Sequence, residues 1–187
     1  MVVTLPDPPI PPSAEEIISY LGMERIPDEE AWFRQTYKSA DVLTSESCGG
    51  RYATARTAGT AIYALITREG FSAMHRLQTD EIWHFYLGTP LELLLLHPDG
   101  SGELVMLGPD LLNGQHPQWV VPRGVWMGAI PIGETSSAYS LIGNTMAPGF
   151  EYADFEIGYR DELQARYPEF ATQIAKLTSP PHFTRIT

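Results

Sequence analysis

The sequence predicts a mainly β protein, an antiparallel sandwich or barrel with one helix before it and helices after it. From Thr60 onward, β-branched and aromatic residues gather in short runs that are separated by Gly, Pro and Asp. The turn-forming sequence HPDG, at residues 97–100, lies between two of these runs. Helical spacing of apolar residues occurs only near the two ends of the chain. Many short strands at nearly even spacing favour a sandwich or barrel over an α/β sheet.

The first element is a short helix. Ser13 and Glu16 have the spacing of a capping box, and an apolar stripe follows them and ends at Gly22. We expect a helix of about two turns here. After a turn at residues 26–28, residues 32–37 fit either a continued helix or a strand, and their alternation favours the strand.

The β region follows. The turn at residues 97–100 predicts a hairpin between residues 91–96 and 103–107. After residues 154–157 the pattern becomes helical, and Pro168 divides it into two segments. We expect this tail to pack on the outside of the barrel.

Length and composition indicate one globular domain. The chain has 187 residues, of which 43% are hydrophobic and 19% charged, and its longest apolar run is far too short to span a bilayer. Residues 1–12 contain five prolines and lack the features of a secretion signal, so we interpret them as an extended arm before a single domain over residues 13–187. These features predict a cytoplasmic protein without a membrane segment.

Charge and cysteine content exclude several classes of function. A formal net charge of −11 argues against nucleic acid as a partner, because Lys and Arg supply the affinity for phosphate backbones. Cys48 is the single cysteine, so an internal disulfide and a Cys-rich zinc site are excluded. A nucleophilic role for Cys48 is the alternative, but we interpret this loop cysteine as incidental.

Two motifs resemble those of the cupin superfamily. His75, Glu81 and Gly88 have the spacing of the first cupin motif, and the Pro-Arg-Gly at residues 122–124 resembles the second. The chain is similar over about residues 13–178 to the uncharacterised group called cupin family 5, in the ordered runs TAIYALI, SAMHRLQTDEIWHFYLGTPLEL, PQWVVPRGVWMGA, YSLIG and APGFEYADFEI. This resemblance implies a double-stranded β-helix, the cupin jelly roll, with flanking helices, and a homodimer. It implies no particular reaction.

The sequence departs from the metal-binding cupin pattern. Leu77 and Met127 stand where that pattern has histidines, so only His75 and Glu81 keep side chains suited to a metal. We therefore expect no cofactor, with a divalent metal at His75 and Glu81 left as the alternative. Residues 26–30, IPDEE, also differ from the His-Pro-Glu-Gly-Gly of similar proteins, which leaves the role of this segment open.

The first motif suggests a polar pair inside the barrel. Period-2 alternation places Glu81, Trp83 and Phe85 on one face of a strand and His84 on the other. His75 and Glu81 then form either an oriented general base or a hydrogen bond that only satisfies two buried polar groups. By analogy with sugar epimerases of the superfamily, Tyr139 is a candidate general acid, and Tyr63 is another.

The remaining candidates would line an aromatic pocket for one small molecule. The ligand-binding candidates are Tyr63, Trp83, Phe85, Gln118, Trp126 and Met127. The favoured function is a metal-independent isomerase, epimerase or lyase. The alternatives are a non-catalytic module that binds a small ligand and, less favoured, a metal-dependent enzyme.

Overall fold

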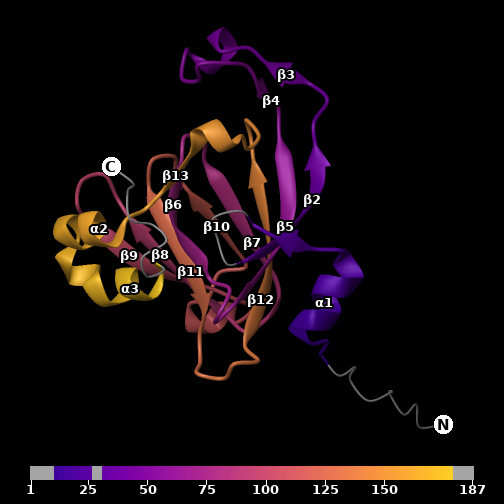
Figure 1. Cartoon of the computed structure of the whole chain (residues 1–187), viewed down its shortest axis with the longest axis vertical. Coiled ribbons are helices and arrows are strands. Elements are labelled where there is room, and N and C mark those ends of the chain that lie inside the picture. The colour runs from indigo at the N-terminus through magenta and orange to yellow at the C-terminus, as the bar shows by residue number, and fades with distance from the viewer. Residues whose placement is uncertain (1–10, 27–30, 179–187) are drawn as a thin grey trace.

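The computed structural model describes residues 11–26 and 31–178 and contains two antiparallel sheets that pack face to face (Figure 1). The six-stranded sheet has the order β1-β2-β5-β12-β7-β10, and the five-stranded sheet has the order β13-β6-β11-β8-β9. The first sheet consists of β1 (Glu24–Arg25), β2 (Trp32–Lys38), β5 (Thr60–Thr67), β12 (Tyr139–Met146), β7 (Glu81–Gly88) and β10 (Gln118–Val121). The second consists of β13 (Phe155–Ile157), β6 (Ser72–Leu77), β11 (Trp126–Pro131), β8 (Leu91–Leu96) and β9 (Gly102–Leu107). The predicted barrel is confirmed.

Several expectations concern segments that lie outside the described residues. These are most of the predicted arm, at residues 1–10, and the segment at residues 27–30 that differs from similar proteins. The chain after residue 178 also lies outside them. No helix in the described part of the chain is long and apolar enough to cross a membrane.

The N-terminal helix α1 (Ala14–Leu21) begins and ends as its sequence predicts. Ser13 Oγ accepts a hydrogen bond from the Glu16 backbone N–H at 3.2 Å, and Glu16 Oε2 accepts one from the Ser13 N–H at 2.8 Å. Gly22 ends the helix with a φ of 59°, which a glycine adopts without strain. The buried face of α1, including Ile17, packs on the outer face of the six-stranded sheet.

The predicted hairpin and the first long strand are both confirmed. β8 and β9 pair in antiparallel register from Leu91↔Leu107 to Leu96↔Gly102, across the turn at residues 97–100. β2 pairs with β5, so residues 32–37 form a strand rather than a continued helix. A small two-stranded sheet of β3 (Val42–Leu43) and β4 (Arg56–Thr57) stands above the barrel, with the 3₁₀ helix Glu46–Cys48 between its strands (Figure 1).

The C-terminal helices cover the outside of the five-stranded sheet, as predicted (Figure 1). α2 (Arg160–Arg166) is followed by a 3₁₀ turn that starts at Pro168, and then by α3 (Ala171–Lys176). Two further 3₁₀ turns, Leu111–Asn113 and Tyr152–Asp154, lie in the loops. The helices bury Leu163 and Ile174 against outward-facing leucines of β8.

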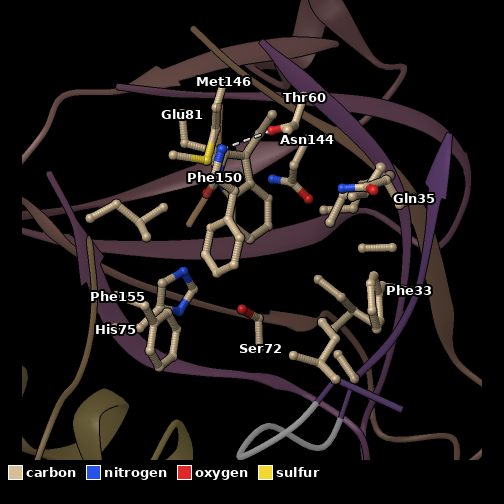
Figure 2. A pocket seen from close by; sticks show the side chains of 18 of the residues that line it. Phe33, Gln35, Thr60, Ser72, His75, Glu81, Asn144, Met146, Phe150 and Phe155 are labelled. Carbon is tan, nitrogen blue, oxygen red and sulfur yellow. Dashed lines mark hydrogen bonds between the residues drawn. The ribbon is translucent and has the colours of Figure 1, made fainter. Parts of the chain in front are cut away.

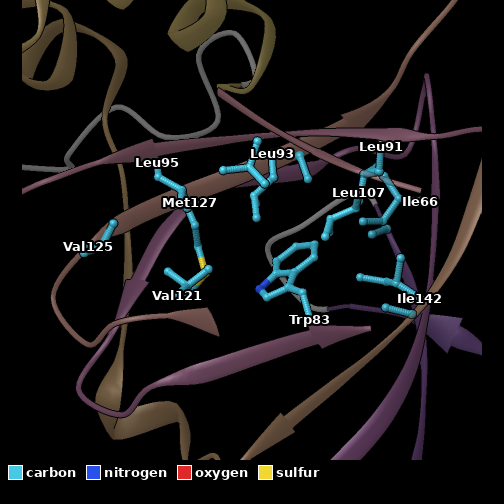
Figure 3. Close-up of a cluster of buried hydrophobic side chains, with 14 of the residues drawn as sticks. Ile66, Trp83, Leu91, Leu93, Leu95, Leu107, Val121, Val125, Met127 and Ile142 are labelled. Atoms are coloured by element: carbon cyan, nitrogen blue, oxygen red, sulfur yellow. The ribbon is translucent and has the colours of Figure 1, made fainter. Parts of the chain in front are cut away.

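The space between the two sheets is partly filled and partly open. Inward side chains of β8 and β11 pack against Trp83 and Ile142 of the facing sheet (Figure 3). Leu93, Leu95 and Met127 are almost fully buried there, and burying a leucine side chain contributes about 1.5–3 kcal/mol. This packed part closes one portion of the barrel, and an open pocket occupies another.

Candidate functional site: a pocket in the barrel

A pocket of about 330 Å³ lies between the two sheets (Figure 2). Its wall consists mostly of apolar side chains, with a small number of polar ones, which is typical of small-molecule sites. The apolar residues are Ile26, Ala31, Phe33, Ile62, Ala64, Ile66, Leu77, Trp83, Ile142, Met146, Phe150, Tyr152 and Phe155. The polar residues are Glu24, Gln35, Thr60, Ser72, His75, Glu81 and Asn144.

Glu81 and Trp83 lie two positions apart on β7, so both side chains point into the barrel. The Trp83 indole Nε1–H donates a hydrogen bond to Glu81 Oε2 at 2.7 Å. Glu81 is only 7% exposed. A buried carboxylate needs such donors because burial removes its hydrogen bonds to water. The tryptophan therefore fixes the orientation of the carboxylate.

His75 and Ser72 both line the pocket although they are three residues apart on β6. Strict alternation would put them on opposite faces, but the pairing of β6 with β11 shifts register between Met127↔His75 and Ala129↔Ser72. A bulge of this kind redirects a side chain to the other face of a strand. The irregular strand thus adds a polar group to the pocket.

The environment of His75 determines which ring nitrogen carries the proton. Nδ1 lies 2.7 Å from the carbonyl oxygen of Ala73, and since a carbonyl can only accept, Nδ1 is the donor. In the neutral imidazole, Nε2 is then the basic nitrogen. The ring stacks on Phe155 with centroids 5.3 Å apart, which holds its plane against the pocket wall.

Asn144 is a pocket residue that the sequence reasoning missed. It is 6% exposed and lies on β12 between Trp83 of β7 and Ile62 of β5, with its amide directed into the pocket (Figure 2). Its Nδ2 has no hydrogen-bond partner within residues 11–26 and 31–178. The signal was present in the sequence, because Asn144 alternates with inward-facing Ile142 and Met146. A buried amide donor left unsatisfied is uncommon and suggests a ligand acceptor.

Thr60 lies near Asn144 and supports the loop that closes this side of the pocket. Its Oγ1 accepts a hydrogen bond from the Phe150 backbone N–H at 3.0 Å (Figure 2). The contact fixes the segment after β12, from which Phe150 and Tyr152 extend over the pocket. Thr60 is therefore a structural part of the wall.

Of the predicted site residues, His75, Glu81 and Trp83 line one pocket. Phe85 and Met127 contribute to the packed interior instead of the pocket wall. Met127 lies directly opposite His75 in the β6–β11 pair, yet its side chain joins the filled part of the barrel.

The expected positions of Tyr63 and Tyr139 inside the pocket are wrong. Inward-facing positions on β5 are Ile62, Ala64 and Ile66, so Tyr63 points outward. There its ring packs at right angles to that of Tyr86, with the ring centroids 5.8 Å apart. Tyr139 packs beneath α1 and donates its hydroxyl to the Pro12 carbonyl at 2.6 Å. Burial and, after it, the charge of Glu16 raise the pKa of Tyr139. Neither tyrosine lies opposite His75 as a general acid.

The expected positions of Gln118 and Trp126 are also wrong. Gln118 is exposed and donates its amide Nε2–H to Nδ1 of His84 on the outer face, at 3.1 Å. Trp126 and Met127 are neighbours on β11, so only one of them can face the interior. Trp126 faces outward, beneath the C-terminal helices.

The donor set does not fit a metal of the type that the cupin pattern holds. Within residues 11–26 and 31–178, no group of three or more His, Cys, Asp or Glu side chains is arranged to bind an ion. Leu77 lines the pocket at one expected ligand position, and Met127 occupies the other. Cys48 is half-buried and is not among the residues of the pocket wall. Metal independence itself stays a prediction.

Comparisons with known proteins agree with the observed fold. A family model described as Cupin superfamily (DUF985) matches residues 15–158. The uncharacterized protein YML079W of Saccharomyces cerevisiae is 28% identical over 184 residues, which cover 94% of this chain and 90% of the yeast protein. The crystal structure of protein SO0799 from Shewanella oneidensis has a TM-score of 0.78 at 30% identity, over 91% of this chain and 99% of that one. A hypothetical protein from Leishmania major has a TM-score of 0.78 at 28% identity, with coverages of 89% and 99%.

Proposed function

The chain belongs to the cupin superfamily, in the DUF985 family, and on that basis we propose that its barrel pocket binds a small organic molecule and transfers a proton on it. The reaction class is that of a metal-independent isomerase, epimerase or lyase. The observation that carries the proposal is a buried polar constellation of His75, Glu81 and Asn144 in a pocket with mostly apolar walls. A barrel that served only as a hydrophobic core would gain nothing from these groups.

His75 is the proposed base. Its Nδ1–H is held by the Ala73 carbonyl, so Nε2 accepts the proton that leaves a carbon of the ligand. Asn144 Nδ2 donates to an oxygen on the adjacent carbon, where negative charge develops as the proton leaves. Return of the proton from Nε2 to a neighbouring carbon gives isomerisation, whereas epimerisation needs a second proton donor, such as water, on the opposite face of the ligand. Loss of a leaving group gives a lyase reaction.

One substitution of His75 separates the roles of its two ring nitrogens. His75→Asn keeps a donor near the position of Nδ1 but removes Nε2, so the pocket keeps its shape and loses its base. Ligand extracted from gently purified protein is identified by mass spectrometry and returned to the protein in D₂O. Wild type introduces deuterium into the ligand, whereas His75→Asn binds it and introduces at least about a hundredfold less.

The matched control for this exchange is His84→Asn. His84 lies on the outer face of the barrel, where it contacts Gln118 and Thr145, and it does not line the pocket. This variant retains wild-type exchange. Equal exchange in wild type and His75→Asn rules out His75 as the base.

Asn144→Leu tests the amide donor because the substitution affects stability and ligand affinity differently. Removing an unsatisfied buried donor leaves stability unchanged or raises it by about 1 kcal/mol, because its desolvation cost disappears. The same change weakens ligand binding by about tenfold or more. A variant that loses stability and keeps full affinity contradicts the proposed role.

A non-catalytic binding module is the second candidate, and the predominantly apolar wall favours it. In this case the ligand is retained without change and no deuterium enters it, even in wild type.

The predicted homodimer also stays a prediction. Exposed Leu104 lies on the edge strand β9, where a second copy could pair. Size-exclusion chromatography with light scattering gives twice the chain mass of 20.8 kDa if the prediction holds.

A further inference from the structure

A second concave site lies beside the barrel pocket and is lined by Arg51, Arg76 and Arg123. This groove, hereafter the arginine groove, has a volume of about 640 Å³. The three arginines come from separate segments: the loop between β3 and β4, the end of β6, and the turn between β10 and β11. Such a gathering of cations is notable because the chain as a whole has a formal net charge of −11.

Contacts with two side chains orient Arg76 in this groove. Its Nε and Nη2 donate to the two carboxylate oxygens of Glu156 at 2.8 and 2.9 Å. Its guanidinium also lies over the Trp126 ring, 4.5 Å from the ring centroid. Glu156 compensates this charge through Nε and Nη2, and Nη1 takes no part in the pair.

Arg51 and Arg123 differ from Arg76 because neither side chain has a carboxylate partner within the described ranges. The Arg51 guanidinium extends over the ring of its neighbour Tyr52, with Cζ 5.6 Å from the ring centroid. The backbone N–H of Arg123 donates to Asp80 Oδ1 at 2.8 Å, which fixes the turn and leaves the guanidinium exposed. Two guanidiniums that form no ion pair within the described ranges therefore line the groove.

The acidic residues of the groove do not cancel these charges. Asp154 lines the groove, but both of its oxygens accept from Arg56, at 2.6 and 2.7 Å, in a pair that is nearly fully buried. Glu156 is paired with Arg76. Leu77 and Phe155 supply an apolar side, and both also line the barrel pocket.

We propose that the arginine groove binds the phosphate group of a small phosphorylated organic molecule. A carboxylate is satisfied by one guanidinium, as Glu156 is by Arg76, whereas a phosphate ester presents three acceptor oxygens and up to two charges. Guanidiniums from three segments match that geometry better than they match a planar carboxylate. The apolar side formed by Leu77 and Phe155 suits the organic part of such a ligand. The proposal does not depend on proton transfer in the barrel.

The test uses phenyl phosphate as the probe, titrated into the full-length protein at low ionic strength and followed by calorimetry. Wild type binds it, and Arg51→Gln/Arg123→Gln weakens the affinity by at least about tenfold. The matched control is Arg34→Gln/Arg166→Gln, which removes the same charge at exposed positions outside the groove and changes the affinity less than about twofold. Benzoate, as the carboxylate analogue, binds at least about tenfold more weakly than phenyl phosphate.

Several outcomes overturn the proposal. They are no binding of phenyl phosphate by wild type, an equal loss in the groove and control variants, and benzoate binding that matches phenyl phosphate. The D₂O exchange in the barrel is measured on the same variants. Loss of phosphate binding with normal exchange separates the arginine groove from the proposed proton transfer, so either can fail alone.

Discussion

Trp83 donates its indole N–H to Glu81 across 2.7 Å, between two inward positions of the same strand. The contact joins the packed part of the barrel to its pocket, because Trp83 belongs to the core and both residues line the cavity. A carboxylate that accepts this bond is held in one orientation before any ligand arrives.

A double-mutant cycle measures this contact. Trp83→Phe, Glu81→Leu and the double variant are unfolded with urea, and their free energies of unfolding are compared. Hydrogen bonds to charged groups contribute about 1.5–3 kcal/mol, so we expect a coupling energy of this size. Strictly additive effects of the two substitutions contradict the contact.

The buried pair of Arg56 and Asp154 predicts a large loss of stability when one partner is removed. Their side chains are only 4% and 2% exposed, and Asp154 holds the pKa of Arg56 above its usual value. Asp154→Ala leaves a buried guanidinium uncompensated, and we expect the free energy of unfolding to fall by about 3–5 kcal/mol.

The matched comparison is Glu156→Ala, which breaks a similar bidentate pair with Arg76 at a surface position where the side chains are 36% and 54% exposed. We expect a loss of about 0–1 kcal/mol there. Thermal or urea unfolding of both variants checks the difference. Similar losses would mean that burial does not distinguish the two pairs.

His84 predicts a dependence of stability on pH. Burial lowers the pKa of His84 from its ordinary value of 6.5, so the unfolded chain takes up a proton at a higher pH than the folded protein does. This contribution to stability is complete above about pH 6.5 and decreases as the pH falls toward the folded-state pKa. Gln118, which donates to Nδ1, favours the same neutral form.

His84→Gln removes the titrating group. We expect the free energy of unfolding of wild type to decrease more than that of the variant between about pH 7 and pH 5. Urea unfolding at several pH values gives both curves. Parallel curves over this range would show that His84 does not titrate on unfolding.

Gly88 and Gly100 predict unequal costs for the same substitution. Both have φ near +100°, at 100° and 96°, so alanine strains either backbone by about 1–3 kcal/mol. A Cβ on Gly88 would also overlap the backbone carbonyl of Tyr139, whereas one on Gly100 meets nothing within 4 Å. We expect Gly88→Ala to cost at least about 1–3 kcal/mol more than Gly100→Ala, measured by urea unfolding. Equal losses would exclude the overlap as a cause.

The elements of the fold could be predicted from local patterns. The capping box at Ser13 fixes the start of α1, and the turn at residues 97–100 fixes the β8–β9 hairpin, because both depend on residues close together in sequence. The alternation on β7 likewise places Glu81 and Trp83 on one face. Pro168 divides the C-terminal helices because it cannot continue a helix.

The composition of the pocket depended on contacts between distant segments. Local alternation gives two possible faces for a strand, and it does not say which face is covered by another layer. Tyr63 and Tyr139 became surface or helix-facing residues because α1 covers the outer side of β5 and β12. Trp126 faces outward for the same reason, because the C-terminal helices cover the outer side of β11.

By itself, the sequence determined the strands, the helix ends, the family resemblance and two of the polar groups in the barrel, since each depends on neighbouring residues or on a short motif. Only the tertiary structure decided that Ser72 and His75 share a face, through the bulge in β6, and that Asn144 joins them. It alone brought three arginines from separate segments of the chain to one groove. Register and layer packing set these positions, because both arise from pairing between residues far apart in the chain.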